Sequence, residues 1–208
     1  MERLKKNEQM IGRILDSAQK EFARCDYQTA SLNRICEDAG ISKGIIYHYF
    51  ENKDALYLKC VELCFCHVAE AVHYSEAKQC DLRDAIRQYM KNRAVYFEEH
   101  PQEREIFFHA ILRTPPALKG AIDGLKRKFD GQTLSLFQGL LEKSRINRKL
   151  STEDALTFLG VQLDMFYQYF QMETAEKPMQ DAIVEYERQV ELWLDILLNG
   201  LMEKEETK

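Results

Sequence analysis

The chain has 208 residues, of which 45% are hydrophobic, and its formal net charge is −5. A chain of this size can bury a substantial core and hold one large or two small domains. Its four prolines and nine glycines are few for an all-β protein, and its abundant Leu, Ala, Glu, Lys and Gln favour helix.

The charge is unevenly distributed along the chain. Residues 1–60 hold ten Lys/Arg against nine Asp/Glu, whereas the remaining residues hold 19 against 25. Any phosphate contacts must therefore come from a few well-placed cations. The charged start has no signal-peptide pattern, and no apolar run approaches ~18 residues. We expect a soluble, cytoplasmic chain with reduced cysteines and no membrane partner.

The first predicted helix runs from Glu8 to Arg24. Its apolar residues recur at the spacing of one helical face. They are Ile11, Ile14, Leu15, Ala18 and Phe22.

Two short helices are predicted on either side of Gly40. Ser31 is suited to cap the helix Leu32–Ala39. Gly40 follows at the point where helices often end in a left-handed residue, which Gly adopts at little cost. Ser42 caps a second helix, Lys43–Tyr49. Two capped helices around a glycine turn are the helix-turn-helix signature, and the second helix enters the DNA major groove.

The same stretch resembles a known family. The run from Ala39 to Tyr57 reads AGISKGIIYHYFENKDALY, and it is preceded by ILDSAQKEFARCDYQTAS. Together they resemble the DNA-binding domain of the TetR family of bacterial regulators. The resemblance covers about the first third of the chain, and the rest matches the family only in length and helical character. It implies a dimeric regulator that responds to a small molecule.

The second helix of the motif presents polar residues away from its core side. Lys43 can reach a guanine edge or a phosphate, and the Tyr47 hydroxyl suits a phosphate oxygen. His48 can donate to a phosphate or a base. A glycine is costly within a helix, so Gly44 indicates close approach of DNA. A short amphipathic helix with ordinary polar residues is the alternative interpretation.

The resemblance adds contacts around this helix. The first turn of the preceding helix often touches DNA in the family, although a solvated helix start is the alternative for Asn33 and Arg34. A cation in the first turn of a helix, as at Lys53, is mildly unfavourable for the dipole, and phosphate binding would explain it. The predicted DNA-contacting residues are Ser31, Asn33, Arg34, Lys43, Gly44, Tyr47, His48 and Lys53.

The chain departs from the family pattern before the motif. Asp26 stands where the family usually has Gly, and Asp is among the few other residues that tolerate the left-handed conformation. Ala30 stands where the family often has Thr, and whether Thr29 takes over a phosphate contact is open.

A long helix is predicted from Lys53 to about Lys78. The resemblance implies that it connects the DNA-binding domain (the head) to the rest of the chain (the body) and transmits the effect of ligand binding between them. Cys60, Cys64 and His67 share one face of it. Such soft ligands can bind a metal or sense oxidants, whereas free Cys often behaves as a small buried apolar residue. No CxxC pair or fourth ligand accompanies them, so we predict no metal and no cofactor. A thiol- or metal-responsive regulator remains the alternative.

The rest of the chain is predicted to add five helices, each with a start or stop signal. They run from an Asp81 cap to Glu99, from Pro101 to Leu112, from Ala117 toward Ser144, from a capping box of Ser151 and Asp154 to Glu173, and from Pro178 to Glu203. Four glycines weaken the third of these, and the polar connector SRINRK follows it. The predicted fold is all-α with about nine helices, divided into a DNA-binding domain (1–52) and an effector-binding and dimerisation domain (53–208).

The last two helices are apolar on more than one face, which predicts a two-fold partner. The alternative is that both helices lie in the middle of a monomer core. The predicted dimer contacts are Leu159, Leu163, Phe170, Tyr186, Val190, Trp193, Leu194 and Leu197. A two-fold dimer would carry two copies of the DNA-entering helix Lys43–Tyr49. It therefore predicts a pseudo-palindromic double-stranded DNA operator.

Aromatic residues of the body suggest a pocket for a small, flat, hydrophobic effector. The resemblance implies such a pocket, whereas plain core packing is the alternative for each residue. The predicted lining residues are Tyr89, Arg93, Tyr96, Phe107, Phe108, Phe129, Phe137, Gln162, Phe166 and Tyr167.

No Walker loop, GxSxG, HExxH or dinucleotide fingerprint occurs in the chain, so we predict that it is not an enzyme. The favoured function is a dimeric, effector-released repressor, and a helical interaction scaffold without DNA binding is a further alternative.

Overall fold

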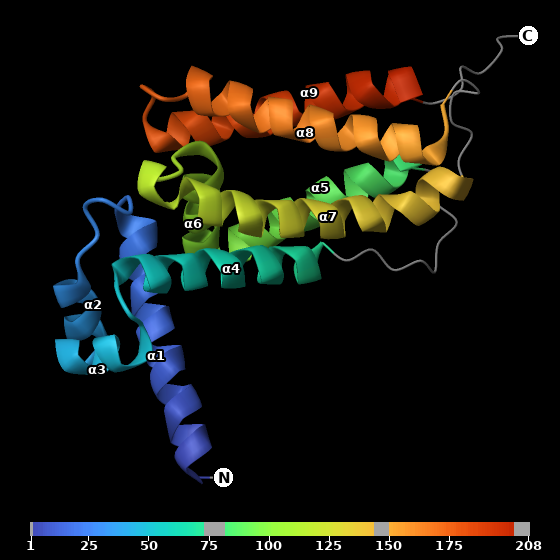
Figure 1. Ribbon diagram of the computed structural model, residues 1–208. Helices are drawn as coiled ribbons and strands as arrows, with labels where there is room; N and C mark the ends of the chain where they lie inside the picture. The colour runs from blue at the N-terminus through green and yellow to red at the C-terminus, as the bar shows by residue number, and fades with distance from the viewer. Residues whose placement is uncertain (1, 73–81, 144–149, 202–208) are drawn as a thin grey trace, which may run out of the picture.

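The computed structural model describes residues 2–72, 82–143 and 150–201 (Figure 1), and all regular structure in these ranges is helical. The elements are α1 (Glu2–Arg24), α2 (Leu32–Ala39), α3 (Lys43–Tyr49), α4 (Lys53–Ala71), α5 (Leu82–Glu99), α6 (Pro101–Leu112), the 3₁₀ turn η1 (Pro116–Leu118), α7 (Lys119–Lys143), α8 (Thr152–Glu173) and α9 (Met179–Leu201). The all-α fold is confirmed.

Several predicted boundaries are confirmed by the structure, and others shift. α2, α3, α6 and the start of α8 lie where predicted, and α8 begins with the full Ser151–Asp154 capping box. α1 starts at Glu2 rather than at Glu8, because a charged first turn forms helix without showing an apolar stripe. α4 ends at Ala71 instead of about Lys78. The predicted Asp81 cap, the SRINRK connector and the end of the last helix lie outside the described residues.

The glycines of α7 do not interrupt it. A glycine in a helix costs about 1 kcal/mol relative to Ala. The buried side of α7 carries Ile122, Phe129 and Phe137, and this helix packs against α4 and α8. Packing of this face therefore outweighs the weak local propensity of α7.

The head and the body meet through two helices. α2 and α3 lie beside α1 in the head, and α4 runs from the head along α6 and α7 of the body (Figure 1). α1 also packs against α6. α6 is therefore in direct contact with the helix that supports α2 and α3.

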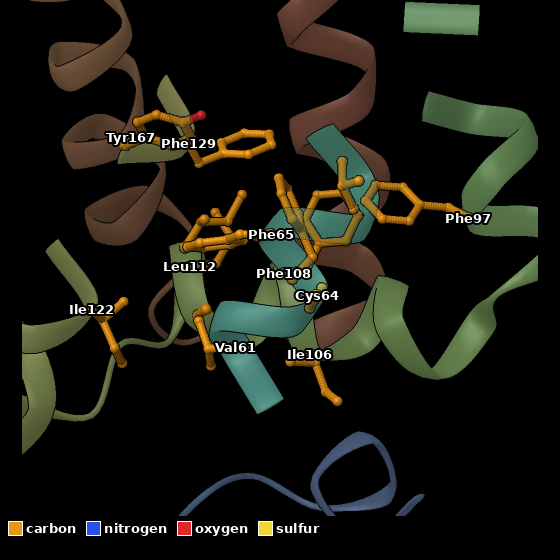
Figure 2. Packing of buried hydrophobic residues seen from close by; sticks show 14 of the residues in the cluster. Val61, Cys64, Phe65, Phe97, Ile106, Phe108, Leu112, Ile122, Phe129 and Tyr167 are labelled. Atoms are coloured by element: carbon orange, nitrogen blue, oxygen red, sulfur yellow. The ribbon is translucent and has the colours of Figure 1, made fainter. Parts of the chain in front are cut away.

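The centre of the body is an aromatic cluster. Figure 2 shows Phe65 of α4 and Phe129 of α7 close together, and their ring centroids are 5.3 Å apart in a stacked arrangement. Phe107 meets both rings edge-on, at 5.5 and 5.7 Å. Such pairs add about 0.5–1.5 kcal/mol each beyond area burial. The cluster joins the long helix α4 to the body.

α8 and α9 lie side by side and form the outer layer of the body (Figure 1). Their inner sides pack ring on ring, with Phe166 4.8 Å from Trp193 and 5.2 Å from Tyr186. Large apolar side chains also lie exposed on the same two helices. These are Phe158, Val161, Met165, Tyr169 and Met172 of α8 and Val184, Leu192 and Ile196 of α9, here called the outer stripes.

Burial contradicts four of the eight predicted dimer contacts and leaves the other four as predictions. Leu159, Phe170, Tyr186 and Val190 are buried within the protomer. The other four, Leu163, Trp193, Leu194 and Leu197, are half-buried against the same core. These residues face inward because both helices are apolar on two sides, and periodicity alone does not say which side meets the core. The outer stripes are the apolar sides of these helices that stay exposed in the single chain.

Within the described residues, no helix is both long enough and apolar enough to cross a membrane.

Candidate DNA-binding interface

The turn between α2 and α3 is built around Gly40. Its φ is 62° and its ψ is 41°, in the left-handed region, and it is the one described glycine with a positive φ. The amide of Gly40 donates to the carbonyl of Glu37 at 3.2 Å, and the amide of Ile41 donates to that of Cys36 at 3.0 Å. This arrangement satisfies the last carbonyls of α2 and turns the chain into α3.

The reading helix is held from beneath by its apolar side. Ile46 of α3 and Ile35 of α2 are fully buried, and Ala39 is buried at the end of α2. Ile14, Ala18 and Phe22 of α1 are also buried, which confirms the predicted stripe. The orientation of α3 therefore depends on α1 and α2 together.

The opposite side of α3 carries the four predicted contacts. Lys43, Gly44, Tyr47 and His48 are all exposed, and the Tyr47 side chain is 52% accessible. A large aromatic residue this exposed packs little within the protomer. None of the ion pairs found among the described residues includes Lys43. We call these four residues the reading edge.

Gly44 has open space where a side chain would begin. A Cβ built on Gly44 would have its nearest neighbour, the Ser42 Oγ, at 3.9 Å. Its φ is also not positive. Neither packing nor backbone conformation within the protomer therefore requires glycine here.

The predicted contacts at the start of α2 differ from one another in exposure. Asn33 and Arg34 are exposed, whereas Ser31 is half-buried at the N-cap position. The Ser31 side chain makes no capping hydrogen bond, so the expected cap is not formed by its hydroxyl. Its amide instead donates to Oε1 of the buried Glu21 at 2.9 Å.

Glu21 connects α1 to the start of α2 through hydrogen bonds. Its Oε2 accepts from Nη2 of Arg24 at 2.7 Å, while its Oε1 holds the amide of Ser31. Burial alone would raise the pKa of this carboxyl, but the hydrogen bonds from Arg24 and Ser31 outweigh it and lower the pKa. The residue was not singled out from the sequence, because a Glu near the end of an amphipathic helix carries no special signal.

Lys53 is engaged within the head. Its Nζ donates to the carbonyl of Tyr27 at 2.7 Å and to that of Ala30 at 3.2 Å, and it lies 4.5 Å from the centroid of the Tyr27 ring. The Tyr27 hydroxyl in turn donates to Asp54, and the Asn52 side chain caps α4 by accepting from the amide of Ala55 at 2.8 Å. The start of α4 is thus fastened to the α1–α2 loop.

The α1–α2 loop uses Asp26 differently from what was expected. No described non-glycine residue has a positive φ, so Asp26 is not left-handed. Its Oδ1 instead accepts from the amide of Thr29 at 2.8 Å and from its hydroxyl at 2.7 Å. The Thr29 hydroxyl therefore stabilises the turn.

Beside this loop is an open groove of about 540 Å³ between the head and the body. Asp26 and Tyr27 line its head side, and His109 and Arg113 of α6 and its C-terminal end line its body side. Burial lowers the pKa of His109, partly opposed by Glu105 and Asp26. The groove lies where α1 packs against α6.

A small cavity of about 70 Å³ lies inside the body, between α5, α7, α8 and α9. Six predicted pocket residues line it, namely Tyr89, Arg93, Phe129, Phe137, Phe166 and Tyr167. Tyr96, Phe107, Phe108 and Gln162 do not line it. Phe107 and Phe108 are fully buried in the aromatic core, and the Tyr96 hydroxyl donates to Glu103.

Seven of the eight predicted dimer residues line this cavity instead, all except Phe170. The second apolar face of α8 and α9 was correctly recognised, but much of it surrounds the cavity. Ile86, Met90, Asp130, Thr133 and Leu134 also line it and were not predicted. Their positions on α5 and α7 match ordinary core spacing, so the sequence held no signal for them.

The Cys60/Cys64/His67 stripe does not form a metal or redox site. Cys60 and Cys64 are fully buried, and Cys64 lies in the core near Ile106 and Phe108 (Figure 2). Burial raises the pKa of Cys60 to about 12 and that of Cys64 well above its usual range. The exposed His67 pairs with Glu103 at 2.8 Å, and the described residues contain no metal-binding group of His, Cys, Asp and Glu. This arrangement disfavours the sensor alternative.

Comparison with known proteins agrees with this geometry. Residues 14–60 match the family model for bacterial regulatory proteins of the tetR family. The chain is 24% identical over 159 residues to the IcaR negative transcriptional regulator of the biofilm operon icaADBC from Staphylococcus aureus (strain Newman), covering 76% of this chain and 82% of that protein. It is 25% identical over 154 residues to the transcriptional repressor AcnR of Corynebacterium diphtheriae, covering 74% and 76%.

The fold also matches solved structures of such regulators. The FadR regulator of Bacillus subtilis, in complex with stearoyl-CoA, superposes with a TM-score of 0.60 at 16% identity, covering 90% of this chain and 97% of that one. The matched family segment contains the whole helix-turn-helix, from the core side of α1 to the first turns of α4. The protein is therefore a DNA-binding transcriptional regulator whose helix-turn-helix segment, residues 14–60, matches that of the tetR family of bacterial regulatory proteins.

Proposed function

We propose that the protein is a repressor that binds a pseudo-palindromic operator as a homodimer and leaves it when a small, largely hydrophobic effector binds the body. The observation that carries the DNA-binding part is the reading edge, in which one cation and two hydrogen-bonding rings are exposed around a glycine. The relatives IcaR and AcnR are described as a negative regulator and a repressor, which supports repression.

Each residue of the reading edge suits a different contact. Lys43 at the start of α3 can reach a guanine edge or a phosphate, and Tyr47 and His48 can donate to phosphate oxygens. Gly44 leaves room for DNA to approach the helix. Asn33 and Arg34, exposed at the start of α2, extend the set toward the phosphate backbone. Lys53 stays a proposed phosphate contact only if DNA draws its ammonium away from the Tyr27 carbonyl.

The outer stripes support the homodimer. Met165 and Tyr169 of α8 and Ile196 of α9 are all more than half exposed in the protomer. Apolar residues exposed in a contiguous patch usually mark an interface. A two-fold pair would present two reading helices to half-sites about 34–36 Å apart, one turn of DNA. The proposed boundary between the DNA-binding and dimerisation domains stays at residues 52 and 53.

The cavity in the body is the proposed effector site. Its walls are mostly aromatic and aliphatic, as is usual for small-molecule sites. The FadR structure contains stearoyl-CoA, which supports an apolar effector for a protein of this fold. An effector releases DNA only if it binds the non-reading arrangement of the dimer more tightly than the reading one. Movement of α6 against α1 is the proposed route to the head.

The test is selection of bound fragments from the source genome, followed by measurement of the recovered sites. We expect an enriched pseudo-palindromic sequence. The Lys43→Ala/Tyr47→Ala double variant should lose retention on it while keeping the melting temperature of the wild type. Loss of stability without loss of DNA affinity would favour the scaffold alternative. We infer a regulator rather than an enzyme, and no part of the proposal requires catalysis.

A further inference from the structure

Arg93 of α5 is a charged residue at the wall of the body cavity. It is 7% exposed, and it lies between the cavity and an outer groove formed with α6 and α9. Charged side chains are rarely buried to this degree without a partner of opposite charge.

No carboxylate neutralises Arg93 within the described part of the chain. None of the ion pairs there includes it, and two of the acids that line the groove or the cavity with it have other partners. Glu187 accepts from Arg104 at 3.3 Å, and Asp130 accepts from Lys126 at 3.0 Å. Lys126 also pairs with Asp164 at 2.9 Å.

Tyrosine hydroxyls surround the guanidinium instead. Tyr186, Tyr89 and Tyr167 all lie near Arg93 and interact with its charge. Burial raises the pKa of all three hydroxyls, so they are neutral at physiological pH. Their oxygens can accept hydrogen bonds from Arg93 and their O–H groups can donate to a bound anion, but they supply no charge.

A buried cation without a counter-ion is unfavourable for folding. Replacing a buried ionic group by an apolar one of similar volume is often neutral or stabilising. Groups that lower stability in this way are commonly found at functional sites. The position of Arg93 at the cavity wall indicates that the missing charge comes from a ligand.

We infer that Arg93 receives the anionic head of the effector, and that the effector is a hydrophobic monocarboxylate whose apolar part enters the cavity beside Trp193. That the ligand acts as an effector rests on the proposed function. The binding site itself is inferred only from Arg93 and the residues that line the cavity. A guanidinium binds a carboxylate through two parallel hydrogen bonds. One negative charge also matches Arg93, the one cation among the described residues that line the cavity, whereas a phosphate dianion would keep one charge unpaired.

The size of the cavity sets a further condition. Its volume is about 70 Å³, well below the roughly 300–1,000 Å³ of typical small-molecule sites. A ligand longer than a few atoms must therefore push the α9 wall outward, where Trp193, Leu194 and Leu197 are only half-buried. Binding would then move α9 relative to α5, so the ligand would bind the moved arrangement better than the original one. Such a difference in affinity is what release of DNA requires.

Trp193 allows a direct test because it is the one tryptophan in the chain and it lines the cavity. The probes are two matched sets, octanoate with octanamide and octyl phosphate, and phenylacetate with phenylacetamide. Trp193 fluorescence and the melting temperature of the full-length protein are measured with each. We expect at least one carboxylate to bind about tenfold or more tightly than its amide. The inference is overturned if carboxylate and amide bind equally in both sets, or if no probe binds. If octyl phosphate binds more tightly than octanoate, the head group is a phosphate and the inference of a monocarboxylate is wrong.

Variants separate a ligand contact from a structural role. Arg93→Met should lose the carboxylate preference while the amide binds as before, and Arg93→Lys should keep part of it. Arg87→Met, an exposed arginine on the same helix, is the matched control and should change neither. A ligand role also predicts that Arg93→Met keeps the melting temperature or raises it by about 2–4 °C. A clear fall in melting temperature with an unchanged carboxylate preference would show that Arg93 only supports the tyrosines.

The two proposals fail in different ways. If no genomic DNA is retained, the regulator proposal fails while a carboxylate preference at Trp193 can still be observed. If an operator is found and no carboxylate preference exists, the regulator stands and the inference about Arg93 fails.

Discussion

The ammonium of Lys53 donates a hydrogen bond to the backbone carbonyl of Tyr27 at 2.7 Å, and so joins the first turn of α4 to the loop that precedes α2. The same nitrogen also reaches the carbonyls of Gln28 and Ala30. A cation in the first turn of a helix is unfavourable for the dipole, but here it satisfies carbonyl oxygens of a loop that no helix pairs. Its first role in the DNA-free protein is therefore structural.

The Lys53→Ala variant should be less stable than the wild type. Hydrogen bonds to a charged donor are lost, and for this half-exposed lysine we expect a decrease of about 1–2 kcal/mol in the free energy of unfolding. Urea unfolding followed by circular dichroism measures it. Lys43→Ala is the control, since that residue is exposed and should change stability by about 0.5 kcal/mol or less. Equal stability of the two variants would show that the hydrogen bond from Lys53 to the Tyr27 carbonyl does not contribute to the free energy of unfolding.

Gly44→Ala should separate folding from DNA binding. Alanine favours a helix by about 0.5–1 kcal/mol over glycine, and a Cβ here meets only the Ser42 Oγ at 3.9 Å. The variant should be at least as stable as the wild type, yet bind the operator about tenfold or more weakly if DNA approaches the helix closely. Gly131→Ala on α7 is the matched control, with open space around it and no place in the reading edge. Unchanged operator affinity in Gly44→Ala would show that DNA does not approach the helix closely at this glycine.

His109 makes stability depend on pH. Burial lowers its pKa in the folded state below the value of about 6.5 found in an unfolded chain. The stability linked to its neutral form is therefore fully present above that value and is lost as the pH falls through the folded pKa. The unfolding free energy of the wild type should drop more between about pH 7 and pH 5 than that of His109→Gln. Parallel curves for the two proteins would contradict the prediction.

The outer stripes should hold the dimer together. Ile196→Glu places a charge on α9 at a side chain that is 59% exposed in the protomer, so the single chain should fold normally. Burying that charge between two copies costs several kcal/mol, which is roughly a hundredfold or more in the dissociation constant. Sedimentation velocity should show monomers at concentrations where the wild type is dimeric. Val95→Glu on α5 is a control of similar exposure, 46%, and should stay dimeric.

The buried thiols should be slow to react. Cys60 and Cys64 are fully buried with raised pKa values, whereas Cys25 and Cys66 are half-buried. Iodoacetamide followed by peptide mass spectrometry should therefore label Cys25 and Cys66 before Cys60 and Cys64, because the thiolate is the reacting form. Labelling of Cys60 and Cys64 should follow the rate of unfolding. Rapid labelling of Cys64 in the native protein would reopen the thiol-sensing alternative.

The sequence by itself determined the head of this protein. Neither Ser31 nor Ser42 makes the predicted capping hydrogen bond. The stripe of Ile14, Ala18 and Phe22, the left-handed turn at Gly40 and the outward side of α3 instead depend on spacings within a few helical turns and on the glycine that ends α2. Such local patterns already define which residues face the core, and the structure agrees with them.

Only the tertiary structure decided which apolar side of α8 and α9 lines the cavity and which stays exposed on the single chain. Leu163 and Met165 differ by two positions on one helix, yet Leu163 lines the cavity and Met165 is exposed. Nor could the sequence indicate that Arg93 makes no ion pair within the described residues, or that Lys53 hydrogen-bonds to the carbonyl of Tyr27. Each depends on groups brought together from distant parts of the chain, and helical periodicity carries no information about what a face will meet.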